Sequence, residues 1–289
     1  MEYKRICPNC SKELIYKSYS AWYNANKLNS LCRSCGAKQS AQHCGDLSKL
    51  LEDNPISWYW IGFILADGSI INGRLKIGLS IKDKEHLLKF AEFINYSGSF
   101  AENTTSIQVA VKDLEIVNKI CDKYNILPKK TYNPPSILNT LSIDALYCIL
   151  AGFIDGDGNI QHQNKREDFF LRIKNHSTWK NVLKLFGTLI TDKECVKINN
   201  QGYAELCITN TKILQEFKSK ILSYNLPLLT RKWDIIDINY VSKLSKVEEL
   251  RNKVLELLKQ GIKQQDIAII CNTSPANVSK IKKQYAERK

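Results

Sequence analysis

Two aspartates each close an apolar stretch of similar sequence. Asp67 lies in GFILADG and Asp157 lies in GFIDGDG, and a glycine follows each of them, Gly68 and Gly158. We expect both stretches to be helices that these glycines end in the left-handed conformation. Each carboxylate then lies at a helix C-terminus, where the macrodipole is already negative and an acid costs about 0.3–1 kcal/mol. One such aspartate would indicate an ordinary buried helix, but two in equivalent positions indicate a site for a divalent cation.

Small residues recur four positions apart in both stretches. Gly62 precedes Ala66, and Gly152 precedes Gly156, so each pair lies on one face of its helix. A stripe of small residues lets two helix backbones approach closely. We therefore expect the two helices to pack side by side and to bring their acidic ends together. The backbone carbonyl groups of Ala66 and Gly156, in the last turns, are further candidate ligands for this cation.

The segments that follow the two aspartates predict the same order of elements twice. Each half reads helix, two strands, helix, two strands, helix, which predicts an α+β fold of two pseudo-symmetric αββαββα repeats. In the first half the expected strands and helices are residues 74–81, 82–94, 98–102, 106–111 and 113–126. In the second half they are residues 169–175, 177–190, 194–199, 203–209 and 211–222. Two copies in one chain match a partner with its own approximate two-fold axis, such as duplex DNA.

Length and charge narrow the class of protein. The chain has 289 residues, 44% of them hydrophobic, and its formal charge of +13 favours nucleic acid over a membrane surface as the partner. No apolar run reaches the roughly 18 residues of a membrane span, and the N-terminus lacks the apolar core of a signal peptide. We therefore expect an intracellular, cytoplasmic protein with no membrane partner. The expected units are residues 1–45, 46–140, 141–240 and 241–289.

Half of the ten cysteines lie near the N-terminus. Two CxxC pairs, CPNC and CRSC, have a spacing typical of a tetrahedral Zn²⁺ site. Its expected ligands are Cys7, Cys10, Cys32 and Cys35. Disulfides are the alternative, but an intracellular location disfavours them. His43 and Cys44 lie nearby and could replace one ligand, although the symmetrical set of four is preferred.

The C-terminal segment predicts three helices, residues 247–261, 263–272 and 275–286, with Gly261 ending the first. Their arrangement indicates a helix-turn-helix in which Ala268 lies at the tight crossing and the third helix enters a DNA groove. A helical hairpin that caps the core is the alternative. The residues expected to face DNA are Ser274, Asn277, Ser279, Lys280 and Lys283.

The two acidic stretches resemble the LAGLIDADG motif of homing endonucleases, and the second copy matches it closely. The resemblance covers roughly residues 50–240 and implies the double-motif, monomeric form of that family. It implies that Asp67 and Asp157 are catalytic and bind Mg²⁺ at the scissile phosphates. In the first copy Leu65 replaces an acid of the motif, at a position that packs rather than reacts in the family. Asp155 retains that acid in the second copy and is expected to form local bonds.

The resemblance also implies a catalytic basic residue near the end of each repeat. LPKKTYNPP offers Lys130, and LPLLTRKWD offers Arg231 or Lys232, of which we favour Lys232. Both lysines would act through water, polarising the nucleophile or offsetting charge in the transition state; phosphate contact without chemistry is the alternative. At the strand position that often carries a polar active-site residue, we assign Ile81 in the first repeat and Asn175 in the second. The two active sites are therefore expected to be unequal.

The resemblance implies a site-specific endonuclease that hydrolyses one phosphodiester bond in each strand of double-stranded DNA. Water would attack phosphorus and the 3′ oxygen would leave, with divalent metal stabilising both oxygens. Outward side chains of the strands would read bases in the major groove. Two alternatives stay open. One is a catalytically inactive transcription regulator with the same core and helix-turn-helix, which the retention of both aspartates disfavours, and the other is a maturase that binds intron RNA.

Overall fold

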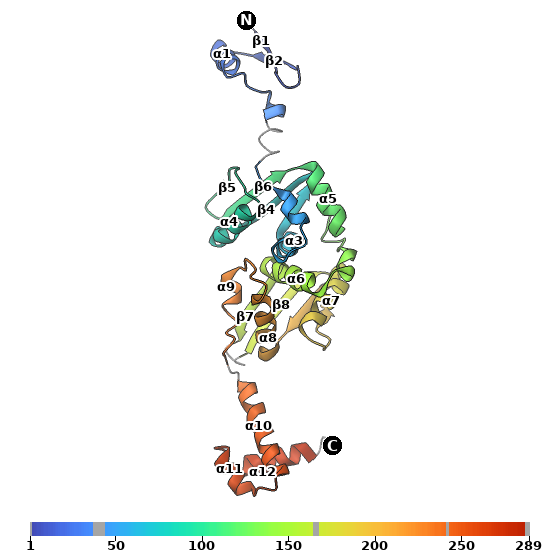
Figure 1. Cartoon of the computed structure of the whole chain (residues 1–289), viewed down its shortest axis with the longest axis vertical. Coiled ribbons are helices and arrows are strands. Elements are labelled where there is room, and N and C mark those ends of the chain that lie inside the picture. The colour runs from blue at the N-terminus through green and yellow to red at the C-terminus, as the bar shows by residue number, and fades with distance from the viewer. Residues whose placement is uncertain (1, 37–43, 164–167, 241–242, 287–289) are drawn as a thin grey trace.

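The computed structural model describes residues 2–36, 44–163, 168–240 and 243–286. Figure 1 shows three parts along the long axis of the molecule: a small N-terminal part, a central part with two sheets, and a C-terminal group of helices. The central part contains one extensive hydrophobic core, and each end has its own small cluster of buried side chains.

The first repeat is built on an antiparallel sheet with the strand order β3-β4-β6-β5. Its register pairs Gly68 with Ile77, and Ile77 with Val109. The elements are η1 (Leu47–Leu51), α3 (Pro55–Asp67), β3 (Gly68–Ile71), β4 (Arg74–Ser80), η2 (Ile81–Asp83), α4 (Lys84–Phe93), β5 (Ala101–Glu102), β6 (Ser106–Lys112) and α5 (Leu114–Tyr124).

The second repeat has the same plan, with the strand order β7-β8-β10-β9. Gly158 pairs with Ile173, and Ile173 with Leu206, so the paired positions of the first sheet have counterparts in the second. The elements are η3 (Ser136–Thr140), α6 (Ile143–Asp157), β7 (Gly158–Gln163), β8 (Asp168–His176), η4 (Ser177–Trp179), α7 (Lys180–Ile190), β9 (Val196–Ile198), β10 (Tyr203–Ile208), α8 (Thr211–Leu222) and α9 (Thr230–Trp233).

The predicted α+β fold of two αββαββα repeats is confirmed. Two strands, β3 and β7, were not among the segments that the sequence predicted, because each starts at the glycine directly after its aspartate. The helices α4 and α7 begin two to three residues later than expected, since a 3₁₀ turn precedes each of them.

Helices α3 and α6 lie against each other at the centre of the molecule with their backbones in contact (Figure 1). A Cβ atom added to Gly62 would lie 1.9 Å from the carbonyl oxygen of Ile149, and one added to Gly152 would lie 1.9 Å from that of Tyr59. No side chain fits in either place. The predicted close packing through small residues is therefore what joins the two repeats.

Gly68 and Gly158 do not have the left-handed conformation that we expected. Their φ and ψ angles are −73° and 151° for Gly68 and −76° and 149° for Gly158, which is extended backbone. A Cβ at either position would lie 2.6 Å from a carbonyl oxygen of the preceding helix, that of Ile64 or Ile154. Glycine is needed because the strand turns back over the last helical turn, and not because of a positive φ.

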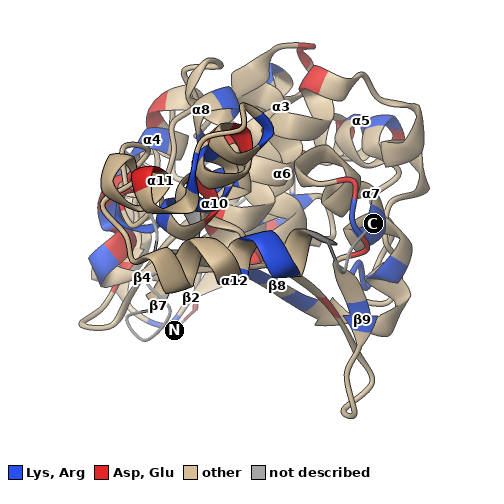
Figure 2. Cartoon of the chain, turned by 90° about the horizontal axis from the view of Figure 1, so that it is seen from below, with Lys and Arg blue, Asp and Glu red and all other residues tan. Residues whose placement is uncertain are grey.

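Side chains alternate across both sheets, as strand geometry requires. In β4, Leu75 and Ile77 are buried under helices, while Arg74 and Lys76 point to the opposite, exposed face. Seen along the long axis, strands of both sheets lie along one side of the molecule, away from α3 and α6 (Figure 2). Lys and Arg are marked along β8 and beside β9 on that side.

The N-terminal part consists of a hairpin, β1 (Tyr3–Ile6) and β2 (Glu13–Tyr16), and the helix α1 (Tyr19–Lys27). Its buried cluster is made of Cys7, Cys32 and Cys35. Cys44, considered above as a substitute zinc ligand, instead packs in the central core, and His43 lies outside the described residues.

The C-terminal part contains α10 (Lys243–Lys259), α11 (Gln264–Ile270) and α12 (Pro275–Ala286). Gly261 has a φ of +79° and ends α10, as expected. Val254, Ala268 and Val278, one from each helix, are buried at their junction. None of the helices in the described part of the chain combines the length and the apolar character that a bilayer crossing requires.

Candidate active site

The two predicted acidic residues, Asp67 and Asp157, are the last residues of α3 and α6, and the structure brings them together. A Cβ added to Gly156 would lie 2.3 Å from Cβ of Ala66 and 3.4 Å from Cγ of Asp67. The last turns of the two helices are thus in contact. The two carboxyl groups are close enough for the charge of Asp67 to act on Asp157, and both act on Lys130.

Both carboxyl groups have raised pKa values. Each side chain is exposed by surface area, yet the surrounding protein displaces much of the water around its carboxyl group. This desolvation raises the pKa of Asp67, and together with the negative charge of Asp67 it raises the pKa of Asp157 to about 6. A place that disfavours two negative charges in this way is one where a cation would be stabilised.

Lys130 and Lys232 reach the ends of the same helices. The Nζ atom of Lys130 donates to the carbonyl oxygens of Leu65 and Ala66, at 2.6 and 2.7 Å. The Nζ atom of Lys232, which is only 8% exposed, lies 2.7–3.0 Å from four carbonyl oxygens. They belong to Ile154, Asp155, Gly156 and Gly158. Burial lowers the pKa of both lysines, while nearby aspartates oppose the shift.

These ammonium groups cap two helix C-termini. The last carbonyl groups of a helix lack partners within it, and a cation there also offsets the negative end of the dipole. The carbonyl groups of Ala66 and Gly156, predicted as Mg²⁺ ligands, therefore already accept hydrogen bonds from lysine. A carbonyl oxygen has two lone pairs, so each keeps one for a cation. With the two carboxylates they form an oxygen-only donor set of the kind that Mg²⁺ prefers.

The side chain of the neighbouring Arg231 binds Asp83 and not the end of α6. It forms an ion pair with Asp83, in which Nε donates to Oδ1 and Nη2 donates to Oδ2 at 2.7 Å. Of the two basic residues that the sequence offered in the second repeat, Lys232 is thus the one at the end of α6.

The two sites differ at the strand that faces them. Nδ2 of Asn175 lies 3.2 Å from Oδ2 of Asp157, as a polar active-site partner would. The registers make Leu79 the counterpart of Asn175 in the first repeat. The assignment of Ile81 is wrong, because Ile81 lies past the end of β4 in the 3₁₀ turn. The sequence could not place this residue, because the alignment depends on hydrogen-bond register, which no local pattern reveals.

Asp155 lies behind the second site in a fully buried network. Its carboxylate accepts hydrogen bonds from Oη of Tyr59 at 2.6 Å, Nε1 of Trp233 at 2.7 Å and the backbone N–H of Leu229 at 2.9 Å. Desolvation raises its pKa to about 6, although these bonds oppose the shift. Asp155 thus forms the expected local hydrogen bonds, and its bond with Tyr59 connects it to α3 of the other repeat. Its counterpart Leu65 is 1% exposed and packs in the core, as predicted.

No protein-family model matches the chain. Among curated proteins it is similar to a reverse gyrase of Methanocaldococcus jannaschii, with 24% identity over 171 residues, or 58% of this chain and 10% of that protein. The chain therefore matches only about a tenth of the length of this curated relative.

Similar solved structures include LAGLIDADG homing endonucleases. I-SmaMI bound to cleaved DNA has a TM-score of 0.45 and 14% identity, covering 70% of this chain and 91% of that one. I-GzeII in complex with its DNA target has a TM-score of 0.39 and 16% identity, covering 76% of this chain and 97% of that one. These values describe a likeness of backbone arrangement.

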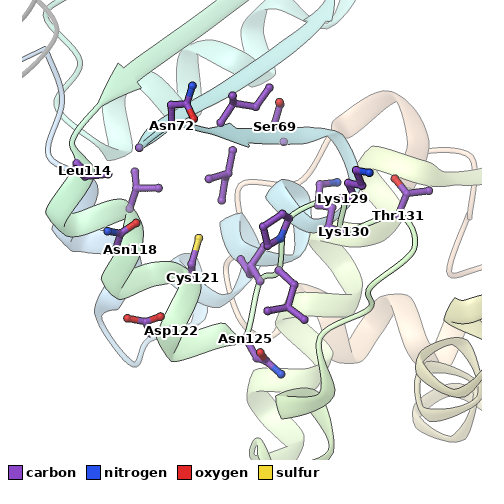
Figure 3. Close-up of a pocket in the computed structure, with 18 residues that line it drawn as sticks. Ser69, Asn72, Leu114, Asn118, Cys121, Asp122, Asn125, Lys129, Lys130 and Thr131 are labelled. Carbon is purple, nitrogen blue, oxygen red and sulfur yellow. The ribbon is translucent and has the colours of Figure 1, made fainter.

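A pocket of about 910 Å³ opens beside Lys130 in the first repeat. Figure 3 shows Asn72 on its strand side, Asn118 and Cys121 on the side of α5, and Lys130 on the loop that closes it.

The corresponding space in the second repeat is filled by the chain itself. The counterparts of Asn118 and Cys121 are Gln215 and Lys218. Gln215 Nε2 donates to the carbonyl oxygens of Asp237 and Tyr240, at 2.8 and 2.7 Å, and Lys218 Nζ donates to those of Trp233 and Ile236, at 2.8 and 2.7 Å. The segment that follows α9 thus occupies the place that stays open beside Lys130.

The four cysteines predicted to bind zinc form a cluster in the N-terminal part. Their Sγ atoms all lie within 4.8 Å of one another, and those of Cys10 and Cys32 are 3.7 Å apart. The edge of a ZnS₄ tetrahedron is about 3.8 Å long. Backbone N–H donors of Cys32 and Cys35 lower the pKa of the Cys7 thiol, to about 6, and of the Cys32 thiol. The neighbouring thiols raise the pKa of Cys35 to about 11. Through its geometry, the cluster of Cys7, Cys10, Cys32 and Cys35 could hold a metal ion.

The residues predicted to face DNA lie at the start and on the outer side of α12. Ser274 caps the helix, since its Oγ accepts from the backbone N–H of Asn277 at 3.2 Å, and Asn277 Nδ2 donates to Thr273 Oγ1 at 3.0 Å. These two side chains fix the turn. The exposed residues opposite the buried side of the helix are Ser279, Lys280 and Lys283.

Among the contacts that cross between the repeats, sequence reasoning missed those of Asp83 and Trp179. Asp83 binds Arg231, and Nε1 of Trp179 donates to the carbonyl oxygens of Lys130 and Thr131 at 3.2 and 3.0 Å. Both residues end a 3₁₀ turn after the long strand of their repeat. That shared position was a usable pattern, but nothing in the sequence indicates what either residue contacts.

Proposed function

We propose that this protein is a site-specific DNA endonuclease that hydrolyses one phosphodiester bond in each strand of a duplex. One observation carries the proposal: two aspartates meet at apposed helix ends, and each helix end also binds a lysine ammonium group. Two half-sites related by a pseudo-two-fold axis fit a substrate with two scissile phosphates on antiparallel strands.

Asp67 and Asp157, with the carbonyl groups of Ala66 and Gly156, would hold Mg²⁺. The bound metal supplies Lewis-acid chemistry, lowering the pKa of water and stabilising charge on phosphate oxygens. Lys130 and Lys232 would hold positive charge beside the reacting phosphates, where they orient water and offset the negative charge of the transition state. The amide of Asn175 would position Asp157, and the first site lacks this bond.

The sheets provide a surface for the duplex. Their uncovered face is basic, because alternate residues of the strands point outward. The outward basic side chains include Arg74, Lys76, Lys112, Arg172, Lys174 and Lys197. Such a surface supplies phosphate contacts, and the polar side chains among them would read base edges in the major groove.

The N-terminal and C-terminal parts would strengthen DNA binding without taking part in the reaction. We assign Zn²⁺ to the four-cysteine cluster as a structural ion, and duplex contact to the exposed side of α12. One chain carries both half-sites, so the active form would be a monomer that acts on intracellular, cytoplasmic DNA.

The experiment is incubation of the full chain with a library of randomised duplexes and Mg²⁺, followed by sequencing of new ends on both strands. We expect paired cuts at one recurrent sequence, lost in Asp67→Asn and Asp157→Asn. Asp192→Asn, which changes an exposed acid far along the chain from both motifs, is the matched control and should cut normally.

Other outcomes would overturn the proposal. Recurrent binding of one duplex sequence without any new ends, in the presence of Mg²⁺, would favour a transcription regulator. Preferential binding of folded intron RNA without cleavage of any duplex would favour a maturase.

A further inference from the structure

Two contacts cross between the repeats at equivalent places. Asp83 and Trp179 each end the 3₁₀ turn after the long strand of their own repeat. Each side chain reaches the lysine-bearing segment of the other repeat, which is α9 for Asp83 and the turn around Lys130 for Trp179. The register of the two sheets makes them counterparts, because Ile77 and Ile173, six positions before them, occupy the same place.

Both residues are held firmly at their own ends. Asp83 is 8% exposed and Trp179 is 1% exposed. Trp179 packs on Phe153 of α6, with ring centroids 5.2 Å apart. A side chain that is fixed in this way can fix what it binds.

The chemistry of the two contacts differs. The indole N–H of Trp179 binds the carbonyl oxygens of Lys130 and Thr131, which are neutral backbone groups. Asp83 binds the guanidinium of Arg231 through two parallel bonds, and those bonds lower the pKa of Asp83. Paired bonds between a guanidinium and a carboxylate are strong and directional. Arg231 directly precedes Lys232, so the ion pair anchors the backbone from which Lys232 extends.

We propose that Asp83 and Trp179 are positioning residues: Asp83 holds Lys232 on the end of α6 through Arg231, and Trp179 holds Lys130 on the end of α3. Each half-site is then completed by the opposite repeat. The consequence for strand cleavage rests on the proposed endonuclease function, whereas the placement of the two lysines does not.

The first measurement needs no nuclease activity. Amine labelling of the full chain under native conditions, read by mass spectrometry, reports how often each lysine leaves its carbonyl partners. Asp83→Asn should raise the labelling rate of Lys232 about tenfold and leave Lys130 unchanged, because a bond to a charged group is lost. Trp179→Phe should raise the labelling of Lys130 alone. Glu85→Gln, at an exposed acid two positions away, is the control and should change neither rate.

The second measurement uses a supercoiled plasmid that carries a cleavable site. Asp83→Asn should slow cleavage of the strand that the Lys232 site cuts about tenfold, so that nicked circles accumulate. The Kd for the DNA site should not change. Asp83→Glu should restore part of the rate because it keeps the carboxylate.

The outcomes separate the two ideas. Selective labelling without any cleavage by the unaltered protein would support the positioning role and count against the endonuclease. Unchanged labelling of Lys232 in Asp83→Asn would overturn the positioning role, whatever the plasmid shows. A weaker Kd in Arg231→Lys, with labelling unchanged, would overturn it too and make Arg231 a phosphate contact.

Discussion

The two repeats share one backbone plan, but the surroundings of their lysines, Lys130 and Lys232, differ. In the second repeat Lys232 is buried among four carbonyl groups, behind it lies the bonded carboxylate of Asp155, and the following segment fills the adjacent space. In the first repeat Lys130 binds two carbonyl groups, Leu65 replaces the acid, and a pocket stays open at its side.

Two sites with different surroundings can therefore be held on one duplicated backbone plan. The contact between α3 and α6 is nearly symmetric, because it is made by backbone atoms. The surroundings of the two sites are made by side chains, which can diverge without disturbing that contact. We therefore expect both sites to depend equally on the helix contact and unequally on what surrounds them.

The largest expected effect comes from removing either acid. Asp67→Asn and Asp157→Asn should each reduce double-strand cleavage by at least about 100-fold, because a group that stabilises charge in the transition state is lost. The affinity for DNA should stay nearly unchanged, since the substitution removes a negative charge from a site that binds a polyanion. Plasmid cleavage and gel-shift titration measure the two quantities. Double-strand breaks at the normal rate in either variant would contradict the catalytic assignment.

Next in size is the loss of a whole structural part. Cys32→Ser should release zinc and unfold residues 2–36, because a segment this small folds poorly without its metal. The two repeats, with their separate core, should remain folded. Metal analysis and limited proteolysis would follow both effects, and an intact protein that contains no zinc would rule the prediction out.

The helix contact should respond symmetrically. Gly62→Ala and Gly152→Ala each place a Cβ 1.9 Å from a backbone oxygen, so each should lower the free energy of unfolding by about 3 kcal/mol. Gly36→Ala, whose Cβ would have no neighbour nearer than 3.9 Å, is the control. Denaturant titration measures all three, and a clear difference between the first two would break the symmetry argued above.

A smaller effect should come from the strand position that differs between the sites. Asn175→Leu makes the second site resemble the first. It should slow cleavage of one DNA strand about tenfold, because a hydrogen bond to a carboxylate is lost. Leu79→Asn is the reciprocal change and should bring the two rates closer. Strand-specific end labels would report each rate, and equal slowing of both strands by Asn175→Leu would count against a local role.

The smallest effect should follow removal of the C-terminal helices. Deletion of residues 245–289 should weaken binding and shorten the protected DNA without moving the cuts. Each lost phosphate contact should reduce the slope of log K against log salt concentration by about 0.9. Footprinting and salt titration of both forms decide it. An unchanged footprint and slope would mean that these helices do not touch DNA.

The sequence predicted those features that leave a local pattern. Small residues four apart predicted the contact of α3 with α6, and two CxxC pairs predicted the four-cysteine cluster. Patterns of apolar residues also placed most helices and strands within a few residues. What failed depends on geometry across the chain: the extended turn at Gly68, the register that matches Leu79 with Asn175, and the pairing of Asp83 with Arg231. Residues that are distant in sequence meet only after the sheets have formed, so a single sequence carries no mark of their pairing.

The crossing contacts bear on how such a protein could be rebuilt from halves. The indole of Trp179 binds main-chain oxygens, which any replacement loop provides if its path is kept. Asp83 needs a guanidinium at one particular position. A chimera that keeps the second repeat and imports a foreign first repeat must therefore import an acid at the place of Asp83, or leave Arg231 without its partner. A chimera made the other way round must bring both an arginine and an indole. Replacing the first repeat and replacing the second therefore impose different requirements, although the two backbones follow the same plan.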